Sequence, residues 1–161
     1  MTTESLHTLF LTTTGAVTDT RKIEKDTMFF ALRGENFNGN EFAEEAIEKG
    51  AKFAIVDDRR YKTSDRIITV NNCLFSLQEL AKFHRKYINP TIIALTGSNG
   101  KTTTKELINA VLSKKYRTVA TKGNLNNHIG VPLTLLSMDK TTEMGIVEMG
   151  ANHLKEIQRL C

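Results

Sequence analysis

The stretch from residue 92 to residue 104 combines glycines, a lysine and threonines in an order suited to binding phosphate. Gly97 and Gly100 have no Cβ atom, so the backbone can turn its N–H groups inward around an anion. Lys101 adds a positive charge for the outer phosphates, and the Thr102 hydroxyl is a suitable oxygen ligand for Mg²⁺. The expected nucleotide-binding residues are Gly97, Ser98, Asn99, Gly100, Lys101, Thr102 and Thr103.

The loop departs from the general phosphate-loop pattern G-x-x-x-x-G-K-[ST], because Leu95 stands where the first glycine belongs. The Gly-Lys-Thr core is also compatible with a glycine-rich turn between a strand and a helix, carrying an exposed lysine. The flanking segments favour the phosphate loop, since an apolar, β-branched run precedes it and a helical pattern follows. The apolar residues of that predicted helix are Leu107, Ile108, Val111 and Leu112.

Glu148 lies near the C-terminal end of another predicted strand, residues 144–150. Open α/β sheets bind ligands at this edge, so Glu148 is a candidate Mg²⁺ ligand together with Thr102. A glutamate that caps a helix or faces solvent fits the same spacing. The nearby His153 could be a metal ligand, a general base or a structural hydrogen-bonding group.

The segment 122–130 is rich in asparagine and also follows a predicted strand. Its amides could donate hydrogen bonds to oxygens of a substrate or nucleotide, which makes Asn126 and Asn127 candidate substrate-binding residues. Asparagine and glycine at this density are equally typical of a plain turn.

Two polar segments near the N-terminus could bind an anionic group. The first, Asp19, Thr20 and Arg21, offers a hydroxyl and a guanidinium group beside a strand end. The second is a tight loop that contains Gly34, Glu35 and Asn36. Taken alone, each segment has the composition of an ordinary surface turn.

The elements that position these residues form a small α/β unit and the beginning of a second one, so we expect an α/β fold. The first unit has a weak helix signal at 1–14, helices after Asn40 and at 74–87, and a turn-rich loop at 33–40. We expect Asn40 to cap the first of these helices and Gly50 to end it. The predicted strands are 16–21, 27–32, 53–56 and 67–70.

The second unit begins after Pro90, which gives predicted domains at residues 1–88 and 89–161. Its predicted strands are 91–96, 118–121 and 144–150, with a helix after the phosphate loop and another after Pro132. Strands that alternate with helices indicate a parallel sheet, and such sheets usually need more strands and two covered faces. We therefore expect this chain to be a fragment of a longer protein with a truncated nucleotide-binding domain.

The composition of the 161 residues is that of an ordinary globular protein, with 40% hydrophobic and 25% charged residues. A net charge of +4, spread along the chain, gives no indication of nucleic-acid binding. The two cysteines form no disulfide framework, and neither a signal peptide nor a membrane-spanning run is visible. We expect a cytoplasmic protein without membrane insertion, and a monomer.

Taken together, these segments resemble the Mur ligase family, the ATP-dependent amide-bond ligases of bacterial cell-wall precursor synthesis. Residues 95–102, Leu-Thr-Gly-Ser-Asn-Gly-Lys-Thr, look like the family's own phosphate loop, which lacks the first glycine of the general pattern. Within the family, residues 123–136 and 148–153 are similar to the member that adds D-alanyl-D-alanine. Residues 18–35 are similar to its uridine-nucleotide-binding domain.

The resemblance implies that ATP, with Mg²⁺, drives the joining of D-alanyl-D-alanine to UDP-N-acetylmuramoyl-tripeptide through an acyl-phosphate intermediate. Lys101, Glu148 and His153 would be catalytic, and Thr102 and Glu148 would hold Mg²⁺. The uridine nucleotide would contact Asp19, Thr20, Arg21, Gly34, Glu35 and Asn36.

The family's carbamoylated lysine and third domain are not matched in this chain, so we expect the chain alone to catalyse no ligation. Two alternatives remain open from the sequence. One is the related ligase that adds the third peptide residue. The other is a non-catalytic module that binds UDP-muramoyl peptide.

Overall fold

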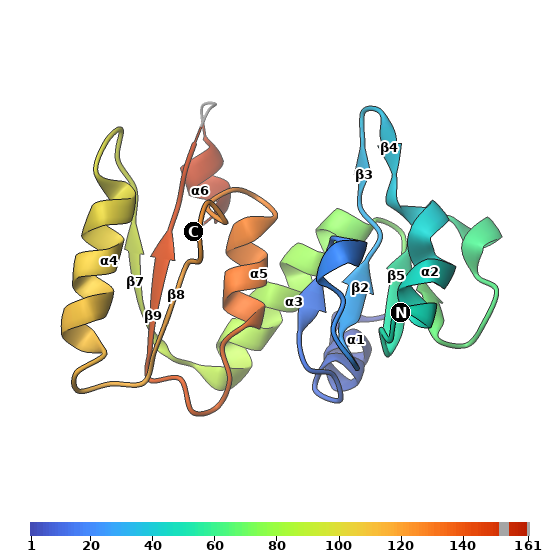
Figure 1. The fold of residues 1–161 in the computed structure, drawn as a ribbon, viewed down its shortest axis with the longest axis horizontal. Coiled ribbons are helices and arrows are strands. Elements are labelled where there is room, and N and C mark those ends of the chain that lie inside the picture. Colours follow the sequence, from blue (N-terminus) through green and yellow to red (C-terminus); the bar gives the residue numbers. More distant parts are fainter. Residues whose placement is uncertain (152–154, 161) are drawn as a thin grey trace. The chain divides into compact units, whose positions relative to one another are not determined.

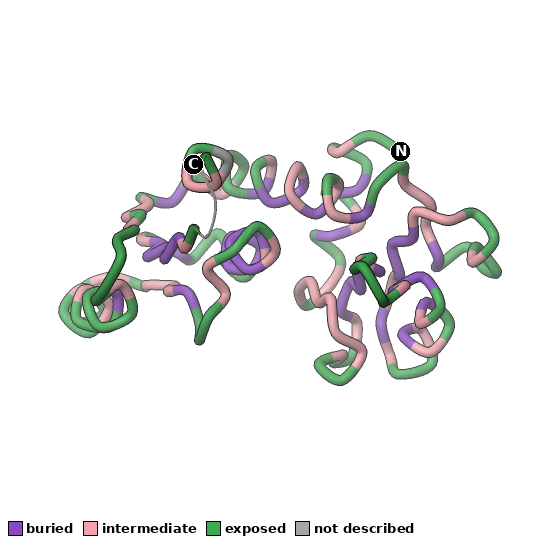
Figure 2. Tube along the Cα trace, turned by 90° about the horizontal axis from the view of Figure 1, so that it is seen from above, coloured by how far each residue is buried: buried purple, intermediate pink, exposed green. Residues whose placement is uncertain are grey.

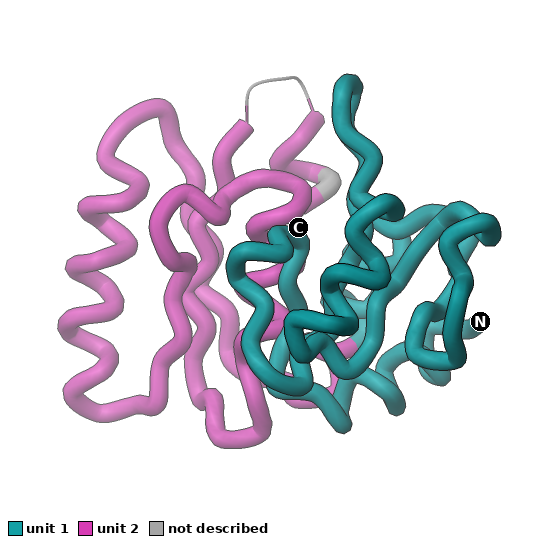
Figure 3. The backbone as a smooth tube through the Cα atoms, turned by 45° about the vertical axis from the view of Figure 1, so that its right-hand side comes forward, with its two compact units in different colours: residues 1–83 teal, residues 84–161 magenta. Residues whose placement is uncertain are grey.

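The computed structural model describes residues 1–151 and 155–160, which form two compact units, Met1–Phe83 and His84–Cys161 (Figure 3). Helix α3 (Cys73–Ile88) carries the chain from the first unit into the second. In the described part of the chain, every helix lacks the length and apolar character that crossing a bilayer requires.

The first unit is built on a parallel sheet with the strand order β1-β2-β5-β6, of which Figure 1 labels the two central strands β2 and β5. Its helices include α1 (Thr3–Phe10) and α2 (Ala43–Glu48). Strand β2 is buried along its whole length because its Met-Phe-Phe sequence is apolar on both faces, as parallel strands usually are. The strand bounds are β1 Ala16–Val17, β2 Met28–Phe30, β5 Phe53–Val56 and β6 Ile67–Thr69.

The predicted helix at 74–87 is confirmed as α3, and its apolar residues recur at helical spacing. Leu77, Leu80 and Ala81 are fully buried. Figure 2 colours the backbone by burial and shows how buried and exposed positions alternate along the helices. His84 on the same face is buried too, and its Nε2 atom lies 2.8 Å from the carbonyl oxygen of Met138. The end of α2 is also as predicted, with Gly50 at a φ of 107° directly after the last turn.

Residues 33–40, predicted as a turn-rich loop, contain a short antiparallel hairpin of β3 (Arg33–Gly34) and β4 (Phe37–Asn38) joined by a turn at residues 35–36. The predicted helix cap at Asn40 is wrong. Asn40 does not cap a helix, because Asn38 accepts the N–H of Asn40 and caps a 3₁₀ turn, Gly39–Phe42, that precedes α2. Asn40 is fully buried, and its amide is used in bonds to Asp57 instead.

The second unit is a parallel sheet in the order β7-β9-β8, which confirms the predicted parallel α/β arrangement (Figure 1). Strand β9 lies between the other two and is nearly all buried. Its last residue, Glu148, pairs in register with Leu95, the last residue of β7. The bounds are β7 Thr91–Leu95, α4 Lys101–Leu112, β8 Thr118–Ala120, α5 Gly130–Leu136, β9 Met144–Glu148 and α6 Glu156–Leu160.

Two details of the second unit differ from expectation. The helix at α4 is present, but Leu107 and Val111 of its predicted apolar face are 63% and 70% exposed. Helix α5 begins at Gly130 and contains Pro132 in its first turn, where the missing N–H of proline costs no helical hydrogen bond.

Candidate functional site

The phosphate loop connects the end of β7 to the start of α4, as the sequence predicts. Gly100 is the N-cap of α4 and has a φ of 77°, a left-handed conformation that residues with a side chain rarely adopt. The first intrahelical bond runs from Thr104 N–H to the Gly100 carbonyl oxygen at 2.9 Å. The loop therefore meets the positive end of a helix, where N–H groups attract an anion.

Lys101 folds back over this loop. Its Nζ atom donates to the carbonyl oxygen of Gly97 at a distance of 2.6 Å. This bond holds the ammonium group against the turn, where a phosphate oxygen could replace the carbonyl as its acceptor.

Glu148 is the buried carboxylate of the site, with only 1% of its surface exposed. Its Oε1 atom accepts from Asn126 Nδ2 at 2.8 Å, and its N–H donates to the Thr121 hydroxyl at 2.9 Å. Its Oε2 atom is buried and has no hydrogen-bond partner among the residues that the structure describes. A buried acceptor without a partner is costly, so this oxygen is suited to a cation.

The two candidate asparagines have different surroundings. The side-chain amide of Asn126 orients Glu148, and the backbone carbonyl oxygen of Asn126 accepts the N–H of Gly150 at 2.7 Å. The Oδ1 atom of Asn127 accepts the N–H groups of Ile129 and Gly130 at the start of α5. The structure thus brings Asn126 to the carboxylate and uses the amide oxygen of Asn127 at a helix end.

The donor set for a metal ion is small in this part of the protein. Within residues 1–151 and 155–160, no group of three or more His, Cys, Asp or Glu side chains could hold a metal ion together. Glu148 and the Thr102 hydroxyl suit Mg²⁺, which usually takes one or two protein oxygens and completes its shell with phosphate and water. The candidate His153 lies outside the described residues.

Asp19 and Arg21 in the first unit bind each other. Asp19 caps a 3₁₀ turn, Thr20–Lys22, and its Oδ1 atom accepts a hydrogen bond from Arg21 Nε at 2.9 Å. The side-chain hydrogen bond from Arg21 is the main cause that lowers the pKa of Asp19 to about 2. The side chain of Arg21 is 85% exposed, so a ligand anion could reach its guanidinium group beside its carboxylate partner.

Asp57 fixes the base of the β3–β4 hairpin, whose connection contains the candidates Glu35 and Asn36. Its Oδ1 atom accepts Arg33 Nε at 2.8 Å and Asn40 Nδ2 at 2.9 Å, and its Oδ2 atom accepts Cys73 N–H at 3.2 Å. Burial alone would raise the pKa of Asp57, but the bonds from Asn40, Cys73 and Arg33 outweigh it and lower the pKa. The sequence reasoning missed this residue, although an acidic pair directly after a buried strand was a signal.

We expect Asp57→Asn to destabilise the protein by about 1–3 kcal/mol, because one of the two acceptor oxygens becomes an NH₂ group that faces the donors of Asn40 and Arg33 or of Cys73. The folded pKa of Asp57 is lowered, so its stabilising effect is present above the unfolded pKa of about 3.9 and is lost as the pH falls. Urea unfolding at pH 7 and at successively lower pH should show wild type and variant converging. Asp65→Asn, at an exposed position, is the matched control. A constant difference across that pH range would contradict the prediction.

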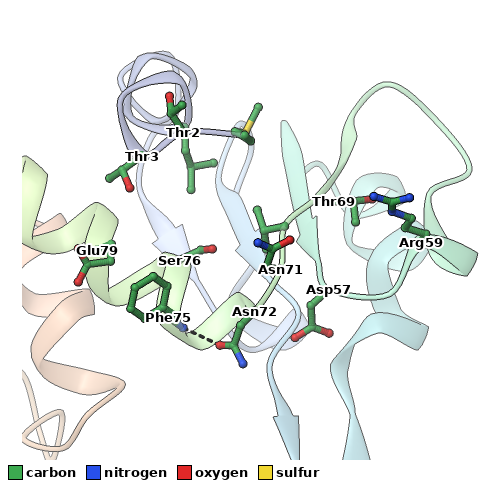
Figure 4. A pocket seen from close by; sticks show the side chains of 13 residues that line it. Thr2, Thr3, Asp57, Arg59, Thr69, Asn71, Asn72, Phe75, Ser76 and Glu79 are labelled. Carbon is green, nitrogen blue, oxygen red and sulfur yellow. Dashed lines mark hydrogen bonds between the residues drawn. The ribbon is translucent and has the colours of Figure 1, made fainter.

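The first unit also contains a cavity of about 440 Å³ where β5 and β6 end (Figure 4). The buried Oγ1 atom of Thr69, in its lining, has no hydrogen-bond partner among the described residues. Asp19–Arg21 and the residues 34–36 lie outside this lining, so the predicted uridine-nucleotide residues are not gathered there. The lining includes Thr2, Thr3, Asp57, Arg59, Asn71, Asn72, Phe75, Ser76 and Glu79.

A parallel sheet, a glycine loop before a helix and a buried carboxylate on the adjacent strand are the arrangement typical of nucleotide-binding domains of the phosphate-loop class. Comparison with known families gives two matches, the model described as "Mur ligase family, catalytic domain" at residues 12–89 and "Mur ligase middle domain" at residues 95–161. The chain therefore belongs to the Mur ligase family, which confirms the prediction from its motifs.

The chain is similar to named ligases and to solved structures. The UDP-N-acetylmuramoyl-tripeptide–D-alanyl-D-alanine ligase of Bacillus subtilis (strain 168) is 45% identical over 149 residues, covering 91% of this chain and 32% of that protein. MurF from Acinetobacter baumannii has a TM-score of 0.82 and 33% identity, covering 99% of this chain and 38% of the other. MurF from Thermotoga maritima, in complex with ADP, has a TM-score of 0.81 and 34% identity, covering 94% and 35%. This chain thus spans about a third of the length of these relatives.

Proposed function

We propose that this chain is part of a ligase that adds D-alanyl-D-alanine to UDP-N-acetylmuramoyl-tripeptide in peptidoglycan precursor synthesis, using ATP. Residues 1–88 would bind the UDP-muramoyl peptide, and residues 89–161 would form the first part of the ATP-binding domain. The observation that carries this proposal is the 45% identity over 149 residues to a relative of that name, which extends across both units. The ADP complex of a solved relative supports nucleotide use.

The residues of the second unit suit the activation step of such a reaction. Lys101 and the N–H groups at the start of α4 would neutralise charge on the phosphoryl group that moves to the tripeptide carboxylate. Mg²⁺, when bound, would further offset that charge, and Thr102 and Glu148 would hold it. Asn126 would keep the Glu148 carboxylate in orientation through the bond to its Oε1 atom. We assign Asn127 to the substrate side of the site, and we keep His153 as a candidate catalytic residue.

In the first unit, Arg21 and the hairpin would hold the uridine nucleotide. The exposed guanidinium group of Arg21 can contact a diphosphate while Asp19 limits its motion. The other residues that we assign to this subsite are Asp19, Thr20, Gly34, Glu35 and Asn36. Because ATP and UDP-sugars are cytoplasmic metabolites, we place the reaction in the cytoplasm. We also propose that the protein acts as a monomer.

Calorimetric titration tests the two halves of this proposal separately. We expect the chain to bind UDP-N-acetylmuramoyl-tripeptide and, in an independent titration, ADP with Mg²⁺. Arg21→Ala should lower the affinity for the UDP-tripeptide and leave the affinity for ADP unchanged. Lys22→Ala, which removes a neighbouring exposed positive charge, is the control. Failure of the chain to bind the UDP-tripeptide would contradict the assignment of the first unit.

The amino donor separates the proposed ligase from its relative that adds the third peptide residue. In the protein extended by the C-terminal part that the relatives carry, we expect phosphate release to require D-alanyl-D-alanine together with the UDP-tripeptide. Phosphate release with the UDP-dipeptide and the amino acid of the third peptide position would identify the ligase that adds the third peptide residue.

A further inference from the structure

Lys105 is a buried charged residue that the proposed mechanism does not use. It lies on α4, four residues after Lys101, and is 1% exposed. Its Nζ atom lies 2.6 Å from the carbonyl oxygen of Thr121 and 2.8 Å from Oε1 of Glu106. Removing an ammonium group from water costs several kcal/mol, and a packed apolar side chain would avoid that cost. A charge retained at this position therefore invites a functional explanation.

Thr121 connects Lys105 to the strand that carries Glu148. Thr121 follows directly after β8 and is 2% exposed. Its carbonyl oxygen accepts from Lys105, while its hydroxyl accepts the backbone N–H of Glu148 at 2.9 Å. Its own N–H donates to the carbonyl oxygen of Ile146 on β9 at 2.9 Å. One residue thus ties α4 to the C-terminal end of β9.

The two candidate magnesium ligands belong to the two elements that this connection joins. Thr102 lies in the first turn of α4, three residues before Lys105, and Glu148 is the last residue of β9. The spacing between these ligands depends on how α4 packs against β9, and Mg²⁺ tolerates little deviation from octahedral geometry.

We propose that Lys105 is a positioning residue that sets Thr102 relative to Glu148 for Mg²⁺, acting through Thr121. The proposal rests on the proposed nucleotide site of the second unit and assigns it a residue outside the phosphate loop. Lys105 touches neither nucleotide nor metal in this role. Its ammonium group fixes the β8 end, and the Thr121 hydroxyl in turn fixes the backbone at Glu148.

The test compares ADP affinity with Mg²⁺ and with EDTA for the wild-type chain, Lys105→Met and Lys114→Met. Lys114 is an exposed lysine just beyond the same helix, so its variant controls for the lost charge. The gain from Mg²⁺ is the ratio of the ADP affinity with Mg²⁺ to the ADP affinity in EDTA. We expect this ratio to be about tenfold smaller in Lys105→Met than in wild type, which is the lower end of what mutating residues around metal ligands costs. The ADP affinity in EDTA should stay within twofold of wild type. Lys114→Met should match wild type in both conditions.

Outcomes distinguish this inference from the proposed function. A folded Lys105→Met protein with the full Mg²⁺ gain overturns the positioning role alone. A wild-type chain without affinity for ADP, or without any gain from Mg²⁺, overturns the nucleotide site and the inference with it.

A second pair of variants keeps the test decisive if Lys105→Met does not fold. Thr121→Val removes the hydroxyl acceptor of the Glu148 N–H but keeps the carbonyl oxygen that Lys105 binds. We expect it to lower the Mg²⁺ gain by a similar factor, and Thr121→Ser, which restores the hydroxyl, should recover it. Equal Mg²⁺ gains in the valine and serine variants would overturn the connection through Thr121.

Discussion

Replacing Lys101 with methionine is expected to lower the affinity of the chain for ADP about 100-fold. The phosphates of a bound nucleotide would then lie over the loop with one of their charge-assisted hydrogen bonds missing. A hydrogen bond to a charged group typically contributes about 1.5–3 kcal/mol, and each 1.4 kcal/mol is roughly a factor of ten in affinity. Calorimetry with ADP measures the loss directly.

The folding of this variant should be unchanged, because the bond from Lys101 to Gly97 is exposed and contributes little to stability. The loss should appear with Mg²⁺ and with EDTA alike, since Lys101 acts on the phosphates themselves. Lys114→Met is the matched control. A Lys101→Met protein that binds ADP within threefold of wild type would show that the loop is not the phosphate site.

Gly130→Ala is expected to destabilise the protein by about 3 kcal/mol, at the upper end of what overpacking usually costs. A Cβ atom at Gly130 would lie 2.3 Å from the carbonyl carbon of Leu125 and 2.4 Å from its Cα atom. Both are backbone atoms, so no side chain can rotate away and the segment at Leu125 must move. Asn126 is the next residue, so its bond to Glu148 should be disturbed as well.

Urea unfolding measures the loss of stability, and Gly123→Ala in the same segment is the control. Gly123 has a φ of 53° but nothing within 4 Å of the added carbon, so only the left-handed backbone should cost stability, by about 1–2 kcal/mol. If the two variants are equally stable, steric crowding at Gly130 is not the cause.

The strands and the phosphate loop could be predicted because their signals are local. Residues 53–56 are apolar and end in the β-branched pair Ile55 and Val56, and Gly97, Gly100 and Lys101 stand at fixed spacing between a strand and a helix. Glu148 could be placed at the edge of the sheet where ligands bind, because recognising the apolar strand in the sequence also locates its C-terminal end. The family could be predicted from the same motifs.

The features that sequence reasoning missed depend on contacts between distant residues. Asn40 and Asn38 are both good capping residues, and the choice between them is set by Asp57, which is 17 residues beyond Asn40. Lys105 stands among charged and polar residues of a helix, where a lysine usually faces water, but it is buried and donates to Thr121, which is 16 residues further along the chain. The exposure of Leu107 and Val111 likewise cannot be read from helical spacing, which identifies an apolar face but not what covers it.

The position of β9 between β7 and β8 has a consequence for how the second unit folds. Strands β7 and β8 are synthesised first but share no ladder, so neither gains sheet hydrogen bonds until residues 144–148 leave the ribosome. The pairing of Leu95 with Glu148 closes a long loop, which slows folding relative to local contacts. The phosphate loop and its carboxylate are therefore assembled in the same late step, so that nucleotide affinity should appear only after β9 has paired with β7 and β8.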